Sequence, residues 1–149
     1  MSEKQSAAAG HGPAAPPTDK ELVLKVIPMP ADTNGNGDIF GGWVMAQVDL
    51  AGSVIPARII RGRMATVAVK EFVFKEPVRV GDILSFYSSV TRIGNTSITV
   101  DVEVFSQRGR SGSREAVKVT EAQLTYVAVD ERRQPRTVPA PGGAGLHRA

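Results

Sequence analysis

Two adjacent glycines, Gly41-Gly42, and one carboxylate, Asp49, are the residues of this chain whose types and spacing best suit chemistry. An apolar stretch begins at the glycines, and Asp49 is its single charged residue before Arg58. If the stretch is a helix, its first N–H groups lack partners and form the positive end of the helix dipole, which stabilises an oxyanion. Asp49 follows within about 12 Å, at the 1.5 Å rise of a helical residue. The segment therefore offers an oxyanion site and a carboxylate able to act as a base or a nucleophile.

The polar turn upstream of the glycines supplies a third candidate, Asn34. Its pattern, Asp32-x-Asn34-x-Asn36-Gly37, matches the first half of a calcium-binding loop. The match then fails, because the twelfth position is Trp43 where a bidentate glutamate is needed, and prolines interrupt the upstream flank. We therefore expect no metal site here and group Asn34 with the reactive carboxylate.

Several catalytic classes are excluded by what the chain lacks. It has no cysteine, which rules out a thiolate nucleophile, a disulfide scaffold and a cysteine zinc site. Its two histidines, His11 and His147, fall in the predicted tails, so neither a serine triad nor a histidine metal site is expected. No Walker loop or dinucleotide fingerprint is present. What remains is a carboxylate site made of Asp49, Asn34 and the main-chain amides of Gly41-Gly42.

A purely structural interpretation of the same residues stays open at this point. Residues 34–37 can be only a turn, Gly41-Gly42 only a helix start, and Asp49 only a hydrogen-bonding group. Against this stands the position of Asp49 on an otherwise small and apolar helix face, because burying an unpaired charge is costly.

The helix that must carry the site is predicted over residues 42–60. One apolar stripe runs along it, formed by Val44, Val48, Ala51, Ile55 and Ile59. Pro56 lacks a backbone donor and is expected to kink or end this helix near its third turn.

The remaining sequence follows the period of two that is typical of strands. Strands are predicted over 21–27, 64–74, 83–93, 96–105 and 116–129, with a two-residue hairpin turn at Gly94-Asn95 and a loose loop at 109–112. Such a sheet must cover the single helix, which predicts an α+β fold with an antiparallel sheet of about five strands wrapped around one long central helix.

Length and composition predict one domain over residues 20–138, because 1–19 and 139–149 are rich in Ala, Gly and Pro and read as flexible tails. The net charge of +3 is modest and its basic residues are scattered, which does not favour nucleic-acid binding. The sequence shows no uninterrupted apolar run of about 18 residues, so no membrane span is expected.

The stretch from Met29 to Met45, with Asp49 after it, resembles the active-site segment of hotdog-fold acyl-CoA thioesterases of the YciA type. The likeness extends over roughly residues 22–138, through segments 66–69, 77–82, 93–97 and 126–130. It implies a hotdog fold that hydrolyses acyl-CoA to a carboxylic acid and CoA. By position, Asp49 would be the catalytic carboxylate and Asn34 its polar partner, while the amides of Gly41-Gly42 would hold the oxyanion.

The resemblance also implies how the substrate is bound. CoA would lie between subunits of a homodimer, itself expected to form a trimer of dimers in the cytoplasm, and no cofactor beyond the substrate's own CoA is expected. The residues assigned to CoA are Arg92, Gly94, Ser97 and Thr66. Basic candidates for its phosphates are Arg92, Arg108, Arg110 and Lys70.

Three other functions remain as alternatives. A hotdog protein could bind acyl-CoA without cleaving it, as a sensor or carrier, although Asp49 argues against this. A hotdog dehydratase or hydratase usually needs a histidine, which the predicted folded region lacks. A plain interaction module would not bind CoA saturably.

Overall fold

The structure, a computed structural model, describes residues 15–108 and 115–139. The predicted loop at 109–112, and most of the two predicted tails, lie outside the described residues. In chain order the elements are β1 (Glu21–Val26), the short 3-10 turn η1 (Pro30–Asp32), α2 (Gly41–Ile60), β2 (Met64–Phe74), β3 (Ile83–Ile93), β4 (Ser97–Arg108) and β5 (Glu115–Ala128).

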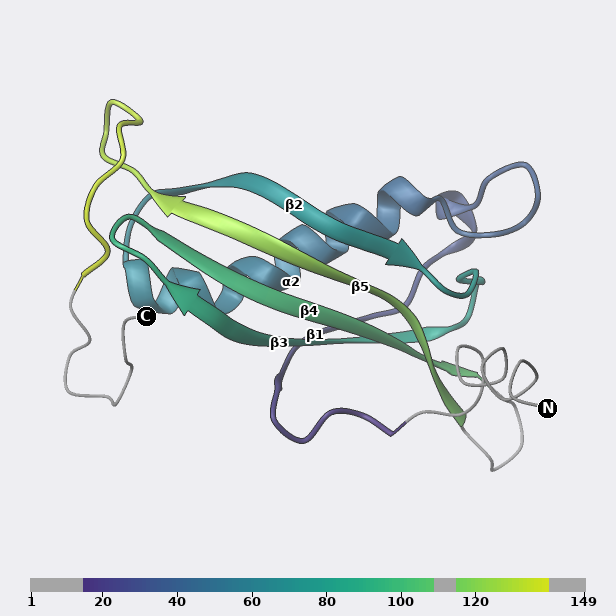
Figure 1. Cartoon of the computed structure of the whole chain (residues 1–149). Helices are drawn as coiled ribbons and strands as arrows, with labels where there is room; N and C mark the ends of the chain where they lie inside the picture. The colour runs from purple at the N-terminus through teal and green to yellow at the C-terminus, as the bar shows by residue number, and fades with distance from the viewer. Residues whose placement is uncertain (1–14, 109–114, 140–149) are drawn as a thin grey trace.

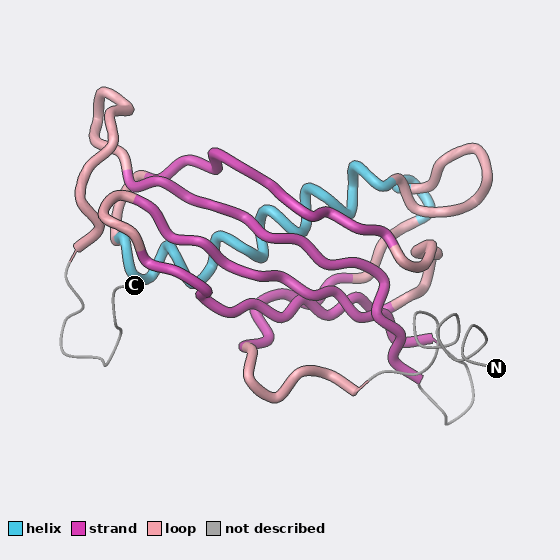
Figure 2. Tube along the Cα trace, in the orientation of Figure 1, coloured by secondary structure: helices cyan, strands magenta, loops and turns pink. Residues whose placement is uncertain are grey.

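The five strands form one antiparallel sheet in the order β1-β3-β4-β5-β2. The long helix α2 crosses one face of this sheet (Figures 1 and 2). The architecture of one central helix against a five-stranded antiparallel sheet is the one that the sequence predicts.

Alternation along β4 explains how the sheet covers the helix. Ile98, Val100, Val102 and Val104 are each fully buried, whereas Thr99, Asp101 and Glu103 are partly exposed on the other face. The buried face packs against Val44, Val48 and Ala51 of α2. Each fully buried aliphatic side chain of this size stabilises the fold by about 1.5–3 kcal/mol.

The helix extends beyond the proline that was expected to interrupt it. Pro56 is buried inside α2, which continues to Ile60 and ends where Arg61 adopts a left-handed conformation with a φ of 53°. The expectation that Pro56 ends the helix is therefore wrong. Pro56 removes one backbone donor, and the turn that follows is held by buried Ile60, which packs in the core between helix and sheet.

By length and composition α2 is apolar enough to cross a membrane, with a mean hydropathy of 1.2. The absence of an uninterrupted apolar run in the sequence did not predict this. The core helix of a globular domain has the same composition, and α2 packs across the sheet through buried Val44, Val48 and Ala51. Composition alone is thus no argument for a membrane span here.

The connection between β3 and β4 is longer than predicted. Three residues, Gly94 to Thr96, separate the strands, and the N–H of Gly94 donates to the carbonyl of Ser97 over 2.8 Å. The predicted two-residue turn is therefore one residue too short. Val138, which is fully buried, donates its N–H to the carbonyl of Asn95, so the last part of the described chain covers this end of the sheet.

One edge of the sheet is apolar and open within the chain. β2 pairs with β5 on one side only, and its Val67, Val69 and Val73 are exposed. Met45 and Leu50 of α2 are exposed as well, Leu50 to 60%. Unpaired strand edges with exposed apolar side chains invite pairing with another chain.

Candidate active site

The carboxylate of Asp49 is held at the helix–sheet interface by two hydroxyl groups. Thr66 of β2 donates to Oδ1 of Asp49 over 2.9 Å, and Tyr126 of β5 donates to the same oxygen over 3.0 Å. Among the described residues no donor contacts Oδ2. Thr66 and Tyr126 are register partners in adjacent strands, which is why both reach the same carboxylate. One carboxylate oxygen is therefore fixed and the other is left for a reacting group.

Tyr126 is a residue of the site that the sequence did not predict. Burial, together with the nearby charge of Asp49 and the hydrogen bond to it, raises the pKa of its phenol well above the ordinary value. The phenol therefore stays protonated at neutral pH and acts as a donor. No local pattern marks Tyr126, since it is a buried position of an alternating strand like its neighbours.

The start of α2 presents unpaired N–H groups, as the sequence predicts. Phe40, the residue before the helix, gives no side-chain cap, and no acidic side chain lies in the first turn. Within the described chain the N–H groups of Gly41 and Gly42 have no partner. A Cβ on Gly42 would meet nothing within 4 Å, whereas one on Gly41 would meet the ring of Phe74 at 3.3 Å. An oxyanion can thus approach this helix end from the open side of Gly42.

Asn34 is fixed by its own turn. Its Oδ1 accepts the N–H groups of Asn36 over 2.8 Å and Asp38 over 3.1 Å. Its amide nitrogen has no partner among the described residues, so the group that Asn34 can offer a substrate is an N–H donor. The carboxylate of Asp32 likewise accepts the N–H of Met29 over 2.9 Å, so two oxygens of the calcium-like pattern serve the turn itself.

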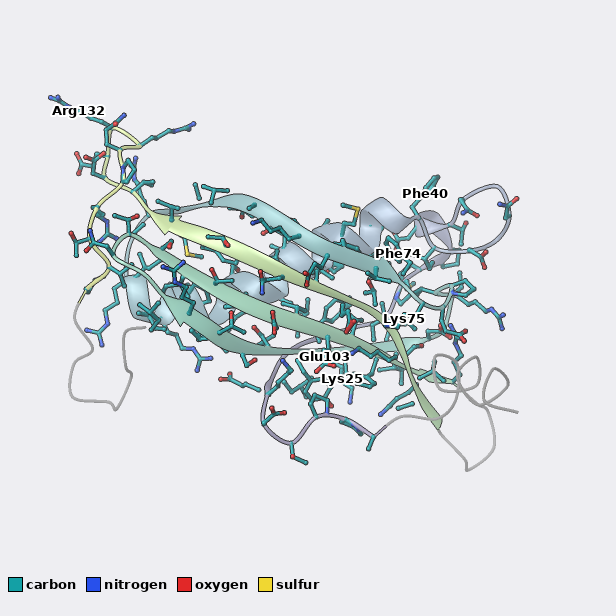
Figure 3. The ribbon with its side chains drawn as sticks, viewed as in Figure 1. Lys25, Phe40, Phe74, Lys75, Glu103 and Arg132 are labelled. Atoms are coloured by element: carbon teal, nitrogen blue, oxygen red, sulfur yellow. The ribbon has the colours of Figure 1, made fainter. Side chains whose placement is uncertain are left out.

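A depression of about 370 Å³ joins Asn34 to the helix start. Its walls come from the turn, the first helical turn and the segment after β2, and they include Asn34, Gly41, Val44, Phe74, Lys75 and Pro77. Phe40 and Phe74 lie at the end of the molecule where α2 begins, and Arg132 lies at the opposite end (Figure 3). Phe74 and Lys75 are lining residues that the sequence did not single out.

Within one chain, Asp49 and the helix start are too far apart to act on one group. Asp49 follows Gly42 by seven positions, which corresponds to about 10 Å along a helix axis. A carbonyl that accepts a hydrogen bond at the helix start must lie about 3 Å from the donors, and a base must lie equally close to the reacting atom. The two halves of the predicted site are therefore not brought together by a single chain.

The four residues assigned to CoA fall in two places. Thr66 contacts Asp49 directly. Gly94 and Ser97 lie at the β3–β4 connection, and Arg92, beside Thr99 in register, belongs to the sheet face opposite α2. Among the described residues the Arg92 guanidinium has no partner.

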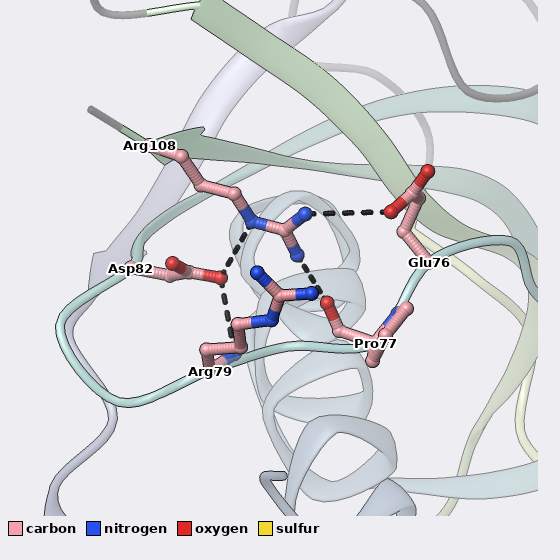
Figure 4. A network of polar contacts seen from close by, with 5 residues as sticks. All are labelled: Glu76, Pro77, Arg79, Asp82 and Arg108. Carbon is pink, nitrogen blue, oxygen red and sulfur yellow. Dashed lines mark hydrogen bonds and ion pairs between the residues drawn. The ribbon is translucent and has the colours of Figure 1, made fainter.

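Arg108, a second basic candidate, is engaged in a network of its own (Figure 4). Its guanidinium contacts Asp82 over 3.1 Å and Glu76 over 3.3 Å, and it donates to the carbonyl of Pro77. Asp82 in turn accepts the N–H of Arg79 over 3.0 Å. Arg108 thus stabilises the segment between β2 and β3, and its donors are engaged there instead of being free to bind a phosphate.

A second depression, of about 440 Å³, lies on the sheet face away from α2 and does not include Asp49. Charged side chains around it pair with one another, for example Lys118 with Glu103 over 2.6 Å. Burial disfavours the charge on Lys118, but hydrogen bonds to Glu103 and Glu121 outweigh it and raise the pKa of Lys118. These pairs make this a satisfied polar surface.

The chain matches a known superfamily. A model of the thioesterase superfamily matches residues 36–113, more than half of the 149 residues of the chain. The chain therefore belongs to the thioesterase superfamily.

Its relatives include acyl-CoA thioester hydrolases of the YciA type. The chain is 46% identical over 125 residues to the acyl-CoA thioester hydrolase YciA of Salmonella typhimurium, a match that covers 82% of this chain and 92% of that protein. It is also similar to a hexameric hotdog-fold thioesterase of Campylobacter jejuni, with a TM-score of 0.75, 44% identity, and coverage of 80% of this chain and 90% of that one.

A further solved structure is an aspartate-to-alanine mutant of a hexameric broad-specificity acyl-coenzyme A thioesterase. The likeness has a TM-score of 0.79 at 39% identity and covers 83% of this chain and 90% of that one. These likenesses confirm the hotdog fold that the motif implied.

Proposed function

We propose that this thioesterase hydrolyses acyl-CoA to a carboxylic acid and CoA, with Asp49 as the catalytic carboxylate. The observation that carries the proposal is the asymmetry of Asp49, whose Oδ1 accepts two hydroxyl groups while Oδ2 has no donor among the described residues. The names of the relatives support the substrate class. A cytoplasmic location belongs to the same proposal, and the cysteine-free chain is compatible with a reducing compartment.

In the first of two routes, Asp49 acts as a general base. Its Oδ2 takes a proton from water while the water oxygen bonds to the thioester carbon, and the carbonyl oxygen becomes an oxyanion. The carbonyl then re-forms, the C–S bond breaks, and the thiolate of CoA leaves. The proton held by Asp49 passes to that thiolate, which regenerates the carboxylate.

In the second route, Oδ2 of Asp49 attacks the thioester carbon itself. The C–S bond breaks and leaves a mixed anhydride between Asp49 and the acyl group, together with CoA thiolate. Water then cleaves the anhydride, and its two protons go to the CoA thiolate and to the product acid, which ionises in neutral solution. Asp49 is regenerated as the carboxylate.

Both routes need donors for the oxyanion, and we assign them to a second copy of the chain. Because Asp49 and Gly42 of one chain lie about 10 Å apart along α2, the amides of Gly41 and Gly42 of the partner subunit would serve the Asp49 of the first. The amide nitrogen of Asn34 would contact the same carbonyl or the attacking water. A two-fold dimer then contains two equivalent sites.

The surface of the chain supports this assembly. The open β2 edge carries exposed Val67 and Val69, and Met45 and Leu50 of α2 are exposed as well. A symmetric dimer through this edge would pair the strand and cover these side chains. The hexameric state of the two solved relatives supports a trimer of dimers as the full assembly.

For CoA we retain Arg92, Gly94, Ser97 and Thr66 as proposed contacts. Arg92 offers a free guanidinium for phosphate, and the β3–β4 connection contributes Gly94 and Ser97. Thr66 is placed by its hydrogen bond to Asp49, so its proposed contact is with the thioester end of the substrate rather than with the nucleotide.

The deciding experiment measures thiol release from a panel of acyl-CoA esters of increasing chain length. Saturable release with catalytic turnover supports the thioesterase. Tight binding of acyl-CoA without release would instead support a carrier or sensor. Single-turnover hydrolysis in ¹⁸O water tests the second route, since label in the Asp49 peptide identifies an anhydride that water opens at the Asp49 carbon. Label in the acid alone arises from direct attack by water on the thioester, and equally from attack by water on the acyl carbon of an anhydride.

A further inference from the structure

Gly52, one turn after Asp49, opens a notch in α2 that admits the Tyr126 hydroxyl. Gly52 is buried, and a Cβ built on it would lie 2.6 Å from the Tyr126 oxygen, closer than any side chain tolerates. The next atoms, Cδ1 of Leu124 and Cγ2 of Val102, lie at 3.4 Å, which is ordinary contact. The phenol oxygen is therefore the one atom that requires glycine at this position.

Through this notch Tyr126 reaches both the backbone and the side chain of Asp49. Its hydroxyl oxygen lies 2.7 Å from the main-chain oxygen of Asp49 and 3.0 Å from Oδ1. A phenol has one proton, which the two acceptors share. Because both acceptors belong to one residue, the contact fixes the orientation of the carboxylate relative to its own backbone.

The helix is weakest in the turn that follows. Pro56 has no N–H, so the carbonyl of Gly52 lacks its helical donor. Ser53 also turns its hydroxyl back onto the carbonyl of Leu50 over 2.6 Å. An anchor from the sheet at Asp49 therefore secures the helix just before the point where its own hydrogen bonding is interrupted.

We propose that Gly52 and Tyr126 form a positioning pair that holds Asp49 so that Oδ2 is the working oxygen. Thr66 of β2 donates to Oδ1 of Asp49, and Tyr126 of β5 fixes the side-chain rotamer of Asp49. Neither Gly52 nor the hydroxyl of Tyr126 needs to touch the substrate. This inference rests on the proposed role of Asp49 and adds the residues that orient it.

The test combines Tyr126→Phe, Gly52→Ala and the double variant, each assayed for kcat and KM with acyl-CoA. Loss of a hydrogen bond to a charged group corresponds to about a 10- to 100-fold effect, so Tyr126→Phe should lower kcat by about that factor with KM nearly unchanged. Gly52→Ala should do the same, because the new methyl group displaces the hydroxyl. Tyr87→Phe is the matched control, since among the described residues the Tyr87 hydroxyl has no hydrogen-bond partner, and it should keep wild-type kcat.

The double variant gives the sharpest outcome. Once the hydroxyl is gone, the Cβ at position 52 meets only ordinary contacts, so Gly52→Ala added to Tyr126→Phe should cost no further activity. Losses that multiply would overturn the pairing. A Tyr126→Phe enzyme with wild-type kcat, or with its loss confined to KM, would overturn the positioning role even if Gly52→Ala fails to fold.

Failure of this inference can be told from failure of the proposed function. If Asp49→Asn is inactive while Tyr126→Phe keeps full activity, only the positioning pair is wrong. If Asp49→Asn keeps activity, the role of Asp49 itself is wrong, whatever the Tyr126 variants show.

Discussion

The hydroxyl of Thr66 donates to Oδ1 of Asp49 over 2.9 Å and so joins the start of β2 to the middle of α2. β2 is also the strand whose other edge is open. A residue that touches the proposed catalytic carboxylate thus lies on the element through which we propose that a second chain docks. Under the proposed function, pairing of a second chain with β2 would influence the position of the Asp49 carboxylate through Thr66.

Replacing Asn34 should separate catalysis from CoA binding. Asn34→Asp keeps the oxygen that accepts the turn N–H groups but removes the amide donor and adds a negative charge. We expect kcat to fall by about 10²–10³, the usual cost of one oxyanion donor, while calorimetry shows nearly unchanged affinity for CoA. Asn36→Asp places the same charge in the same turn and should have little effect. Lost CoA binding with intact kcat at saturation would reverse the assignment.

Mixing inactive subunits should restore activity if each site spans two chains. Asp49→Ala and Asn34→Asp proteins, unfolded and refolded together in equal amounts, should recover up to about a quarter of the wild-type sites by random pairing in a two-fold dimer. Either protein refolded alone is the control. If native mass spectrometry shows mixed dimers and activity stays at the level of the controls, the whole site lies within one chain.

Much of the fold follows from local pattern. Strict alternation at Ile98, Val100 and Val102 predicts one buried strand face, and the apolar stripe through Val44 and Val48 predicts the helix that it covers. These signals are strong because the same burial that creates the pattern also holds the elements together. The predicted end of the helix at residue 60 is correct, and α2 continues through Pro56 because packing of the last turn outweighs the local cost of a proline.

Only the part of the candidate site that is contiguous in sequence can be predicted from the sequence. Asn34, the two glycines and Asp49 lie within 16 positions of sequence and form a recognisable motif. The contacts of Asp49 with Thr66 and Tyr126 span 17 and 77 positions. Strand order creates these contacts, and neither hydrophobic periodicity nor turn chemistry specifies strand order.

Arg108 should stabilise the segment that supports the Asn34 turn. This segment contacts the turn where the N–H of Ile39 donates to the carbonyl of Val78 over 2.8 Å. Arg108→Gln leaves buried Asp82 and partly buried Glu76 without their cation, at a cost of about 1–3 kcal/mol, which should lower Tm by roughly 5 °C in calorimetry. Arg108→Lys keeps the charge without the planar guanidinium, so its Tm should lie between those of the wild type and Arg108→Gln. Equal Tm values for Arg108→Gln and the exposed control Arg132→Gln would contradict this role.

A shortened chain of residues 20–138 should keep Tm and activity. Its ends retain contacts with the body, because Lys20 donates to Ser89 over 3.0 Å and Val138 donates to the carbonyl of Asn95 over 2.8 Å. Removing Val138 as well should lower Tm, since a fully buried valine contributes about 1.5–3 kcal/mol. Loss of folding on removal of residues 1–19 alone would show that the domain begins earlier.

The most direct test of the catalytic role is thiol release by Asp49→Asn. The substitution is nearly isosteric, and its amide oxygen can still accept from Thr66 and Tyr126, so Tm and CoA affinity should be preserved. We predict that kcat falls by about 10²–10⁴, as for loss of a positioned base or nucleophile. Asp101→Asn, on the opposite sheet face, is the matched control and should keep wild-type turnover. Near-normal thiol release by a correctly assembled Asp49→Asn enzyme would contradict the account.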